Sequence, residues 1–254
     1  MGERSDYASG TFCFADVGTT DRPRAAEFYG ELFGWKAQPT MGEYTMFTLQ
    51  ERPVAGMFEA PEGYTPVWIS YISVADADAT AAAVRDGGGS VLLGPRAVSD
   101  EAEVGRTTVI EDPQGAVVAL WEPGLHRGAG LVNQVATMVW NQLATPDLDA
   151  AREFYAGIFD WSYEPVDGSE PPYCEIRNRE GWLNGGAMAL PDGDVPPYWH
   201  VIFTVEDAQA ATARVEELGG SVLEAPTATP MGAFAVVADP AGAAFGFFEG
   251  DVDP

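Results

Sequence analysis

The chain has few of the side chains that hold transition metals and few of those that bind nucleic acids. Its 254 residues include two histidines and two cysteines, and 13 lysines and arginines stand against 39 aspartates and glutamates. The formal net charge of −26 repels phosphate backbones and anionic bilayers. We therefore expect no nucleic-acid partner and no membrane partner. In addition, no apolar run approaches the roughly 20 residues that a bilayer span requires.

The two cysteines, Cys13 and Cys174, lie in strand-like segments of different halves of the chain. This placement does not suggest a disulfide framework and is typical of reduced core thiols in a cytoplasmic protein. Residues 1–10 are polar and acidic, and they lack the basic and apolar regions of a secretory signal peptide. A cytoplasmic location is therefore expected.

A tandem repeat organises the sequence. The segment TTDRPRAAEFYGELFGW around Asp21 matches ATPDLDAAREFYAGIFDW around Asp147, with one offset of 126 residues for the shared aromatic positions. Two later pairs of segments match in the same order, namely 72–92 with 203–223 and 111–123 with 238–250. Three ordered matches predict two copies of one domain, over residues 8–122 and 137–250, joined by a linker over 123–136.

Each copy divides into two similar units. In the first copy, alternation over 11–17 predicts a strand, and Asp21 is suited to cap a helix. Apolar residues then recur at helical spacing from Arg22 to Phe33, and three short strands are expected after them. The same pattern of strand, helix and three strands restarts at Val67. The chain is thus predicted to be an α+β protein with four βαβββ units.

The order and doubling of two motifs resemble the vicinal-oxygen-chelate superfamily, which includes glyoxalase I, extradiol dioxygenases and bleomycin-resistance proteins. The first motif is D-x-x-x-A-x-x-F-Y-x-x-x-F-x-W, from Asp21 and again from Asp147, and the second is the DPxG turn at Asp112 and Asp239. The resemblance implies two tandem domains, each with two βαβββ modules whose curled mixed sheet carries the helices on its outer face. The chain is similar to a tandem-domain actinobacterial subgroup that is labelled glyoxalase-like or hydroxylase and found beside aromatic polyketide antibiotic genes.

The resemblance also implies where a metal would be bound, on the first and last strands of each module and inside the cup of the sheet. The expected positions are Phe14, Gly56, Ile69 and Ala119 in the first copy and Trp140, Gly186, His200 and Gly246 in the second. His200 alone carries a ligating group, and the other histidine, His126, lies in the linker. Sites for Zn, Ni or Fe need several histidine, cysteine or carboxylate ligands. We therefore expect no metal and no cofactor.

Strict alternation along the strands predicts which side chains line the two cups. They are Phe12, Phe14, Asp16, Ile69 and Tyr71 in the first copy and Met138, Trp140, Gln142, Tyr198 and His200 in the second. Aromatic walls with a few polar groups are typical of a site for a flat aromatic or largely apolar molecule. The second cup has more polar groups and is the expected binding site.

Three functions are compatible with these residues. The first is a metal-free binding protein for an aromatic metabolite, in antibiotic biosynthesis or self-resistance. The second is a metal-free enzyme of the hydroxylase-associated, cyclase or isomerase type, with His200, or alternatively Asp16, as its catalytic acid or base. The third is a metal-dependent lyase or dioxygenase, which the count of ligands disfavours. The sequence leaves open whether the two copies pair within one chain or between two chains.

Overall fold

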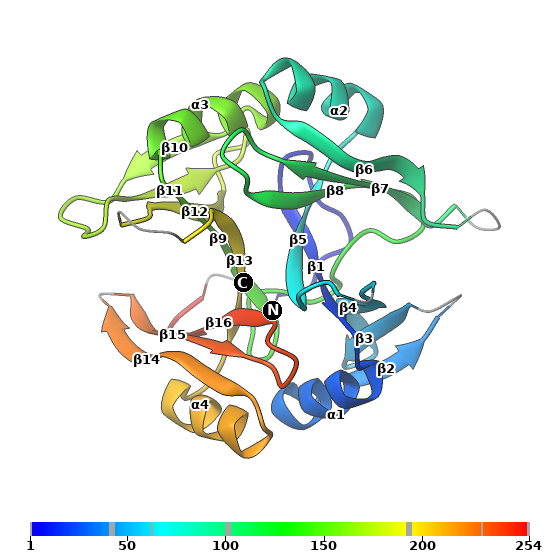
Figure 1. Cartoon of the computed structure of the whole chain (residues 1–254), viewed down its shortest axis with the longest axis vertical. Helices are drawn as coiled ribbons and strands as arrows, with labels where there is room; N and C mark the ends of the chain where they lie inside the picture. The colour runs from blue at the N-terminus through cyan, green and yellow to red at the C-terminus, as the bar shows by residue number, and fades with distance from the viewer. Residues whose placement is uncertain are drawn as a thin grey trace.

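The computed structural model describes residues 2–40, 44–61, 63–99, 103–191, 195–229 and 231–252. In this part of the chain the strands form two eight-stranded sheets, and four helices cover their outer faces (Figure 1). No described helix is long and apolar enough to cross a membrane. The predicted α+β class and the four βαβββ units are confirmed.

The first sheet is built from the first copy of the repeat. Its elements are β1 (Phe12–Thr19), α1 (Arg22–Phe33), β2 (Lys36–Pro39), β3 (Thr45–Leu49), β4 (Arg52–Glu59), β5 (Val67–Ser73), α2 (Ala77–Asp86), β6 (Ser90–Ala97), β7 (Gly105–Glu111) and β8 (Val117–Pro123). The strand order across the sheet is β2-β3-β4-β1-β5-β8-β7-β6. Strands β1 and β5 are antiparallel and join the two modules, whereas β1 with β4 and β5 with β8 are parallel. The sheet is therefore mixed.

The second sheet repeats this arrangement. Its elements are β9 (Met138–Thr145), α3 (Leu148–Phe159), β10 (Ser162–Pro165), β11 (Tyr173–Arg177), β12 (Leu183–Ala189), β13 (Tyr198–Thr204), α4 (Ala208–Glu217), β14 (Ser221–Thr229), β15 (Gly232–Ala238) and β16 (Ala244–Glu249). The order β10-β11-β12-β9-β13-β16-β15-β14 is that of the first sheet, strand for strand. The repeat in the sequence is thus a repeat of structure.

An aspartate caps the N-terminus of each helix. Asp21, Asp76, Asp147 and Asp207 each accept a hydrogen bond from a backbone N–H three residues along, at 2.9–3.1 Å. These bonds satisfy donors that have no partner inside the helix. At the other end of α1, Gly34 takes the left-handed conformation, with φ of 72°, that stops a helix without strain.

The two copies pack against each other within the chain through their helices and the DPxG turns. Tyr29 of α1 donates a hydrogen bond to Asp239 of the second copy at 3.0 Å and accepts one from Trp68 at 2.9 Å. Tyr155 of α3 makes the same pair of bonds with Asp112 and Trp199, at 3.1 and 2.8 Å. All of these groups are buried. The two copies therefore share their cores within the chain.

Two of the expected cup residues face the wrong way. The ladder between β1 and β5 is irregular between Phe12 and Phe14, and the ladder between β13 and β9 is irregular at the matching place. An extra residue in a strand reverses the alternation beyond it. As a result, Phe12 packs on Trp161 and Trp199 in a helix-side core, and Met138 is buried in another. The prediction that Phe12 and Met138 line the cups is wrong.

Candidate functional site

The register of the second sheet brings the polar residues of its cup together. Gln142 on β9 lies opposite His200 on β13 and Gly186 on β12. Two residues before Gln142 on β9, Trp140 lies opposite Ile202 of β13. On its other side, Ile202 lies opposite Gly246 of β16. Trp140, Gln142 and His200 therefore share one face of the sheet.

Glycines stand where the family resemblance implies metal-ligating carboxylates. A Cβ atom on Gly186 would overlap the Tyr173 hydroxyl and lie 3.1 Å from Trp140 Nε1. A Cβ atom on Gly246 would lie 3.2 Å from His200 Nε2. Trp140 Nε1 donates a hydrogen bond to the Tyr173 hydroxyl at 2.9 Å. Larger side chains cannot enter these positions without displacing the groups beside them.

His200 is the chemically distinctive group of this cup. The residue is 7% exposed, and its Nε2 atom is buried without a hydrogen-bond partner among the described residues. Burial lowers the pKa of the imidazole to about 4, so the ring is neutral at pH 7. An unpaired buried polar atom costs about 1–3 kcal/mol. A ligand or a water that bonds to Nε2 would remove this cost.

The remaining residues of the second cup differ in how far they are exposed to solvent. Tyr198 is 41% exposed, and its ring lies 5.9 Å from that of His200 in an edge arrangement. Gln142 is partly buried, and its amide nitrogen lies 2.9 Å from the Met188 sulfur. Tyr173 and Met188 were missed, because they lie on strands whose register with β9 could not be counted from the sequence.

The first cup is filled by its own side chains. Asp16 accepts hydrogen bonds from the hydroxyls of Tyr44 at 2.7 Å and Tyr71 at 3.0 Å. Burial of Asp16 raises the pKa of its carboxyl to about 6, although the two hydroxyls act in the opposite direction. A Cβ atom on Gly56 would overlap both Tyr44 and Asp16. Ile69 pairs with Asp16 across the ladder and is partly exposed.

His126 closes this cup, although it lies in the connecting segment between the two sheets. Its ring centroid is 4.8 Å from that of Phe14 and 5.5 Å from that of Trp121. Its backbone is held on both sides, since its N–H donates to Val104 and its carbonyl accepts from Trp121. Burial lowers the pKa of the His126 imidazole to about 4. The sequence analysis assigned His126 to the linker and missed this role, because no periodic pattern marks it.

Two carboxylates near the cups are structural. Glu122 at the end of β8 accepts the N–H of Ala77, and Glu249 at the end of β16 accepts that of Ala208, both at 2.8 Å. Both glutamates therefore cap a helix, and neither belongs to a cup. They bond to free N–H groups at the starts of α2 and α4, where a helix favours negative charge.

A transition-metal site does not fit the donors in either cup. The described part of the chain contains no group of three or more histidine, cysteine, aspartate or glutamate residues that could hold a metal ion. In the second cup, His200 and Gln142 are adjacent, but Gly186 and Gly246 supply no carboxylate. Two neutral ligands fall short of the three or four that catalytic metals take from a protein. We therefore derive no chemical step through a metal.

Family models match both halves of the chain. A model described as the glyoxalase/bleomycin resistance protein/dioxygenase superfamily matches residues 132–247. A second, described as bleomycin resistance protein-like N-terminal, matches residues 14–49.

Curated relatives extend over nearly the whole chain. A protein of Mycobacterium tuberculosis with the name "Putative glyoxylase CFP32" is 38% identical over 96% of this chain and 97% of its own length. DauV of Streptomyces sp. (strain C5), named as an anthracycline biosynthesis protein, is 33% identical over 96% of this chain and 94% of its own length. DnrV of Streptomyces peucetius carries the same description, with the same identity and coverage.

Solved structures share the fold at low identity. The Mn(II)-bound glyoxalase from Novosphingobium aromaticivorans is 15% identical, with a TM-score of 0.65 over 97% of this chain and 85% of that one. The 2,3-dioxygenase LapB from Pseudomonas sp. KL28 is also 15% identical, with a TM-score of 0.67 over 98% of this chain and 95% of that one. Identities this low establish the architecture alone.

Proposed function

Since the chain belongs to the glyoxalase/bleomycin resistance/dioxygenase superfamily but does not present the donors of a metal site, we propose that it is a metal-free binding protein. Its ligand is a flat, aromatic or largely apolar small molecule, bound in the cup formed by β9, β12, β13 and β16. The observation that carries the proposal is the buried Nε2 atom of His200, which has no described partner and lies beside aromatic side chains.

The chemistry of this cup suits a ring system that carries an oxygen. The Trp140 and Tyr198 rings offer stacking surfaces, and each aromatic pair contributes about 0.5–1.5 kcal/mol beyond the area it buries. A neutral His200 can donate a hydrogen bond to a quinone oxygen or accept one from a phenol. Two relatives are named for the biosynthesis of anthracyclines, which are fused-ring compounds bearing such oxygens. Their names support this ligand class for the present chain.

Calorimetric titration with an anthracycline aglycone tests the proposal. Replacing Trp140 with Ala should weaken binding at least tenfold, which corresponds to about 1.4 kcal/mol. Phe14 holds the matching position in the filled first cup, so Phe14→Leu is the control and should leave the affinity unchanged. If neither Trp140→Ala nor His200→Ala changes the affinity, the second cup is not the binding site.

An enzymatic role for His200 is the second candidate, because its ring is unprotonated at pH 7, although a pKa of about 4 makes it a weak base. An imidazole that is neutral at pH 7 can accept a proton from a bound phenol or an acidic carbon. His200→Ala distinguishes the two functions. A binding protein would retain most of its affinity and show no turnover in either form, whereas an enzyme would lose turnover of its bound ligand.

A further inference from the structure

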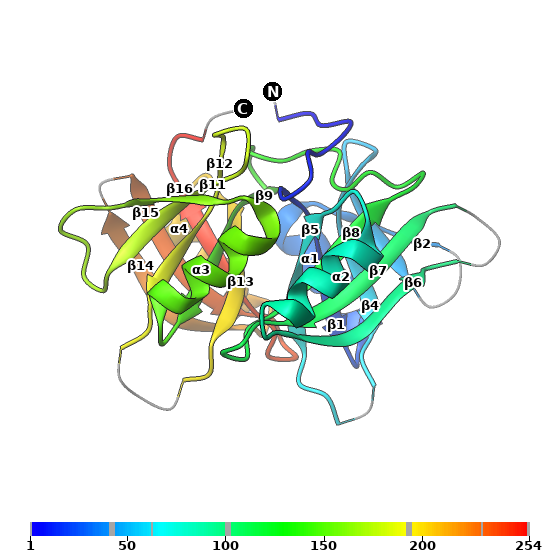
Figure 2. The ribbon, with the colours of Figure 1, turned by 90° about the horizontal axis from the view of Figure 1, so that it is seen from above.

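The chain contains two grooves between helices, which the internal repeat makes equivalent. One lies between α1 and α4 and the other between α2 and α3, where the two copies meet on opposite sides of the molecule (Figures 1 and 2). Because the same elements form both, each side chain in one groove has a matched position in the other. The two grooves can therefore be compared residue by residue.

Arginine side chains close the groove between α1 and α4. Arg24 of α1 donates to the carbonyl oxygen of Leu218 at the end of α4 and pairs with Glu27 at 2.8 Å. Arg214 of α4 pairs with Glu31 of α1 at 2.8 Å and with Glu217 at 3.0 Å. In this groove, two guanidinium groups thus occupy the space between two helices and neutralise its carboxylates.

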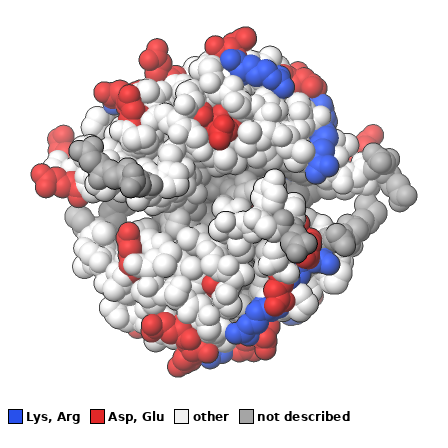
Figure 3. Space-filling model, viewed as in Figure 1, with Lys and Arg blue, Asp and Glu red and all other residues white. Residues whose placement is uncertain are grey.

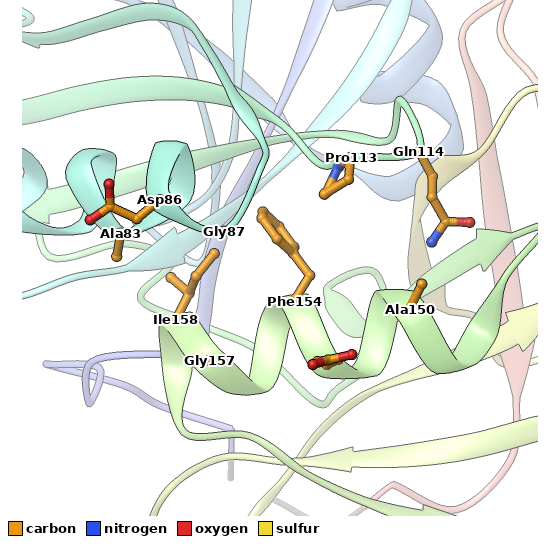
Figure 4. A pocket seen from close by; sticks show the side chains of 10 residues that line it. Ala83, Asp86, Gly87, Pro113, Gln114, Ala150, Phe154, Gly157 and Ile158 are labelled. Carbon is orange, nitrogen blue, oxygen red and sulfur yellow. The ribbon is translucent and has the colours of Figure 1, made fainter.

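The groove between α2 and α3 lacks the side chains that would close it. The matched pairs are Arg24 with Ala150, Glu31 with Gly157, Arg214 with Ala83 and Leu218 with Gly87. Two carboxylates of the closed groove are retained here, since Glu153 stands at the position of Glu27 and Asp86 at that of Glu217. An open cavity of about 550 Å³ results, and Ala83, Asp86, Gly87, Ala150 and Glu153 are among the residues that line it (Figure 4).

The charged side chains that line this cavity are both acidic. Neither Asp86 nor Glu153 takes part in an ion pair with another described residue. The C-terminus of α2, which ends at Asp86, adds the partial negative charge of its last carbonyls. The nearby Arg152 does not line the cavity, since it pairs with Asp149 and lies over the Tyr163 ring.

We propose that the groove between α2 and α3 binds a peptide that carries two arginine side chains. Their guanidinium groups would take the places that Arg24 and Arg214 occupy in the closed groove, against Glu153, Asp86 and the Gly87 carbonyl. Guanidinium groups form charge-assisted hydrogen bonds with carboxylates and carbonyls in this way. The site is separate from the cups and does not depend on the function proposed for them.

Titration of the full chain with the peptide acetyl-Arg-Arg-amide at low ionic strength tests this proposal. The double substitution Asp86→Asn with Glu153→Gln should weaken binding at least tenfold. Glu27→Gln with Glu217→Gln removes the same two charges from the closed groove, so it should leave the affinity within twofold of the wild type. Equal weakening by both pairs would mean that the acidic surface attracts the peptide without a defined site, and this would overturn the proposal.

A blocking variant gives a second, independent measurement. Ala83→Arg with Ala150→Arg copies the side chains of the closed groove, so it should abolish peptide binding and leave the binding of a cup ligand unchanged. The uncharged peptide acetyl-citrulline-citrulline-amide should not bind to the wild type. Undiminished binding of the arginine peptide to this variant, or equal binding of the citrulline peptide, would contradict the assignment of the groove.

Discussion

The burial of His200 makes the stability of the chain depend on pH in a way that one substitution can isolate. The pKa of this imidazole falls from about 6.5 in an unfolded chain to about 4 in the fold, because burial penalises the charged form. Above pH 6.5 the ring is neutral in both states, so the stability is at its full value. As the pH falls below 6.5 the unfolded chain takes up a proton that the folded chain resists, and stability is lost. Between pH 7.5 and pH 5 the loss due to His200 is about 2 kcal/mol.

Urea unfolding of the wild type and of His200→Gln at both pH values measures this loss. The variant should lose about 2 kcal/mol less stability than the wild type between pH 7.5 and pH 5, whatever its stability at pH 7.5. Contributions from His126 and Asp16 cancel in the comparison, because both proteins contain them. An equal loss in the two proteins would refute the assignment of His200 as a buried neutral group. Direct titration of its ring protons by NMR should likewise give a pKa below 5.

Three further predictions concern the residues around the cups and the contact between the copies. Tyr29→Phe removes a hydroxyl that bonds to Asp239 and Trp68, so it should lower the free energy of unfolding by about 1–3 kcal/mol in urea; a change below about 0.5 kcal/mol would contradict this. The pKa of Asp16 is raised in the fold, so the stability that its protonated carboxyl contributes is lost as the pH rises. Between pH 4 and pH 8, the free energy of unfolding of the wild type should therefore fall by about 2 kcal/mol more than that of Asp16→Asn. Parallel curves of stability against pH would show that the pKa of this carboxyl is not perturbed. Gly186→Ala should break the hydrogen bond between Trp140 and Tyr173, which a change in tryptophan emission on ligand-free protein would report; an unchanged spectrum would count against the crowding at this position.

Local signals in the sequence were enough to predict the units of the fold. Each capping aspartate precedes a run of apolar residues at helical spacing, and both kinds of signal act within a few residues. The repeat then fixed how many such units the chain contains. The identical strand orders of the two sheets confirm that this local pattern determines the architecture.

The errors concern features that depend on contacts between distant segments. Nothing in the composition of β1 marks the irregularity before Phe14, so alternation placed Phe12 on the wrong face. His126 enters the first cup because its segment bonds to residues of β8 and to Val104, and no periodic pattern reports this. The bond between Glu122 and the N–H of Ala77 likewise joins residues that lie 45 positions apart in the chain. Register and long-range capping are tertiary properties, and the sequence pattern does not contain them.

The acidic surface places a further condition on any ligand of this chain. Acidic side chains are scattered over the face seen in Figure 3, and few basic ones lie among them. A field of this sign attracts cations and repels anions over roughly 10 Å at 0.1 M salt. An apolar, uncharged molecule can still enter the second cup, because its binding depends on burial and stacking and not on that field. A cationic peptide should approach the groove between α2 and α3 faster at low salt than at high salt.

The two copies show that the open groove between α2 and α3 is not required by the fold. The matching groove between α1 and α4 is closed by arginines, yet the surrounding strands and helices are the same as in the other copy. Closing this groove therefore needs only a few larger side chains. The two cups differ less clearly, because each contains a buried imidazole nitrogen without a described partner, His126 Nε2 in the first and His200 Nε2 in the second. In the groove between α2 and α3, the exposed carboxylates of Asp86 and Glu153 stay without an ion-pair partner among the described residues, and they are the groups to which the proposed arginine peptide would bind.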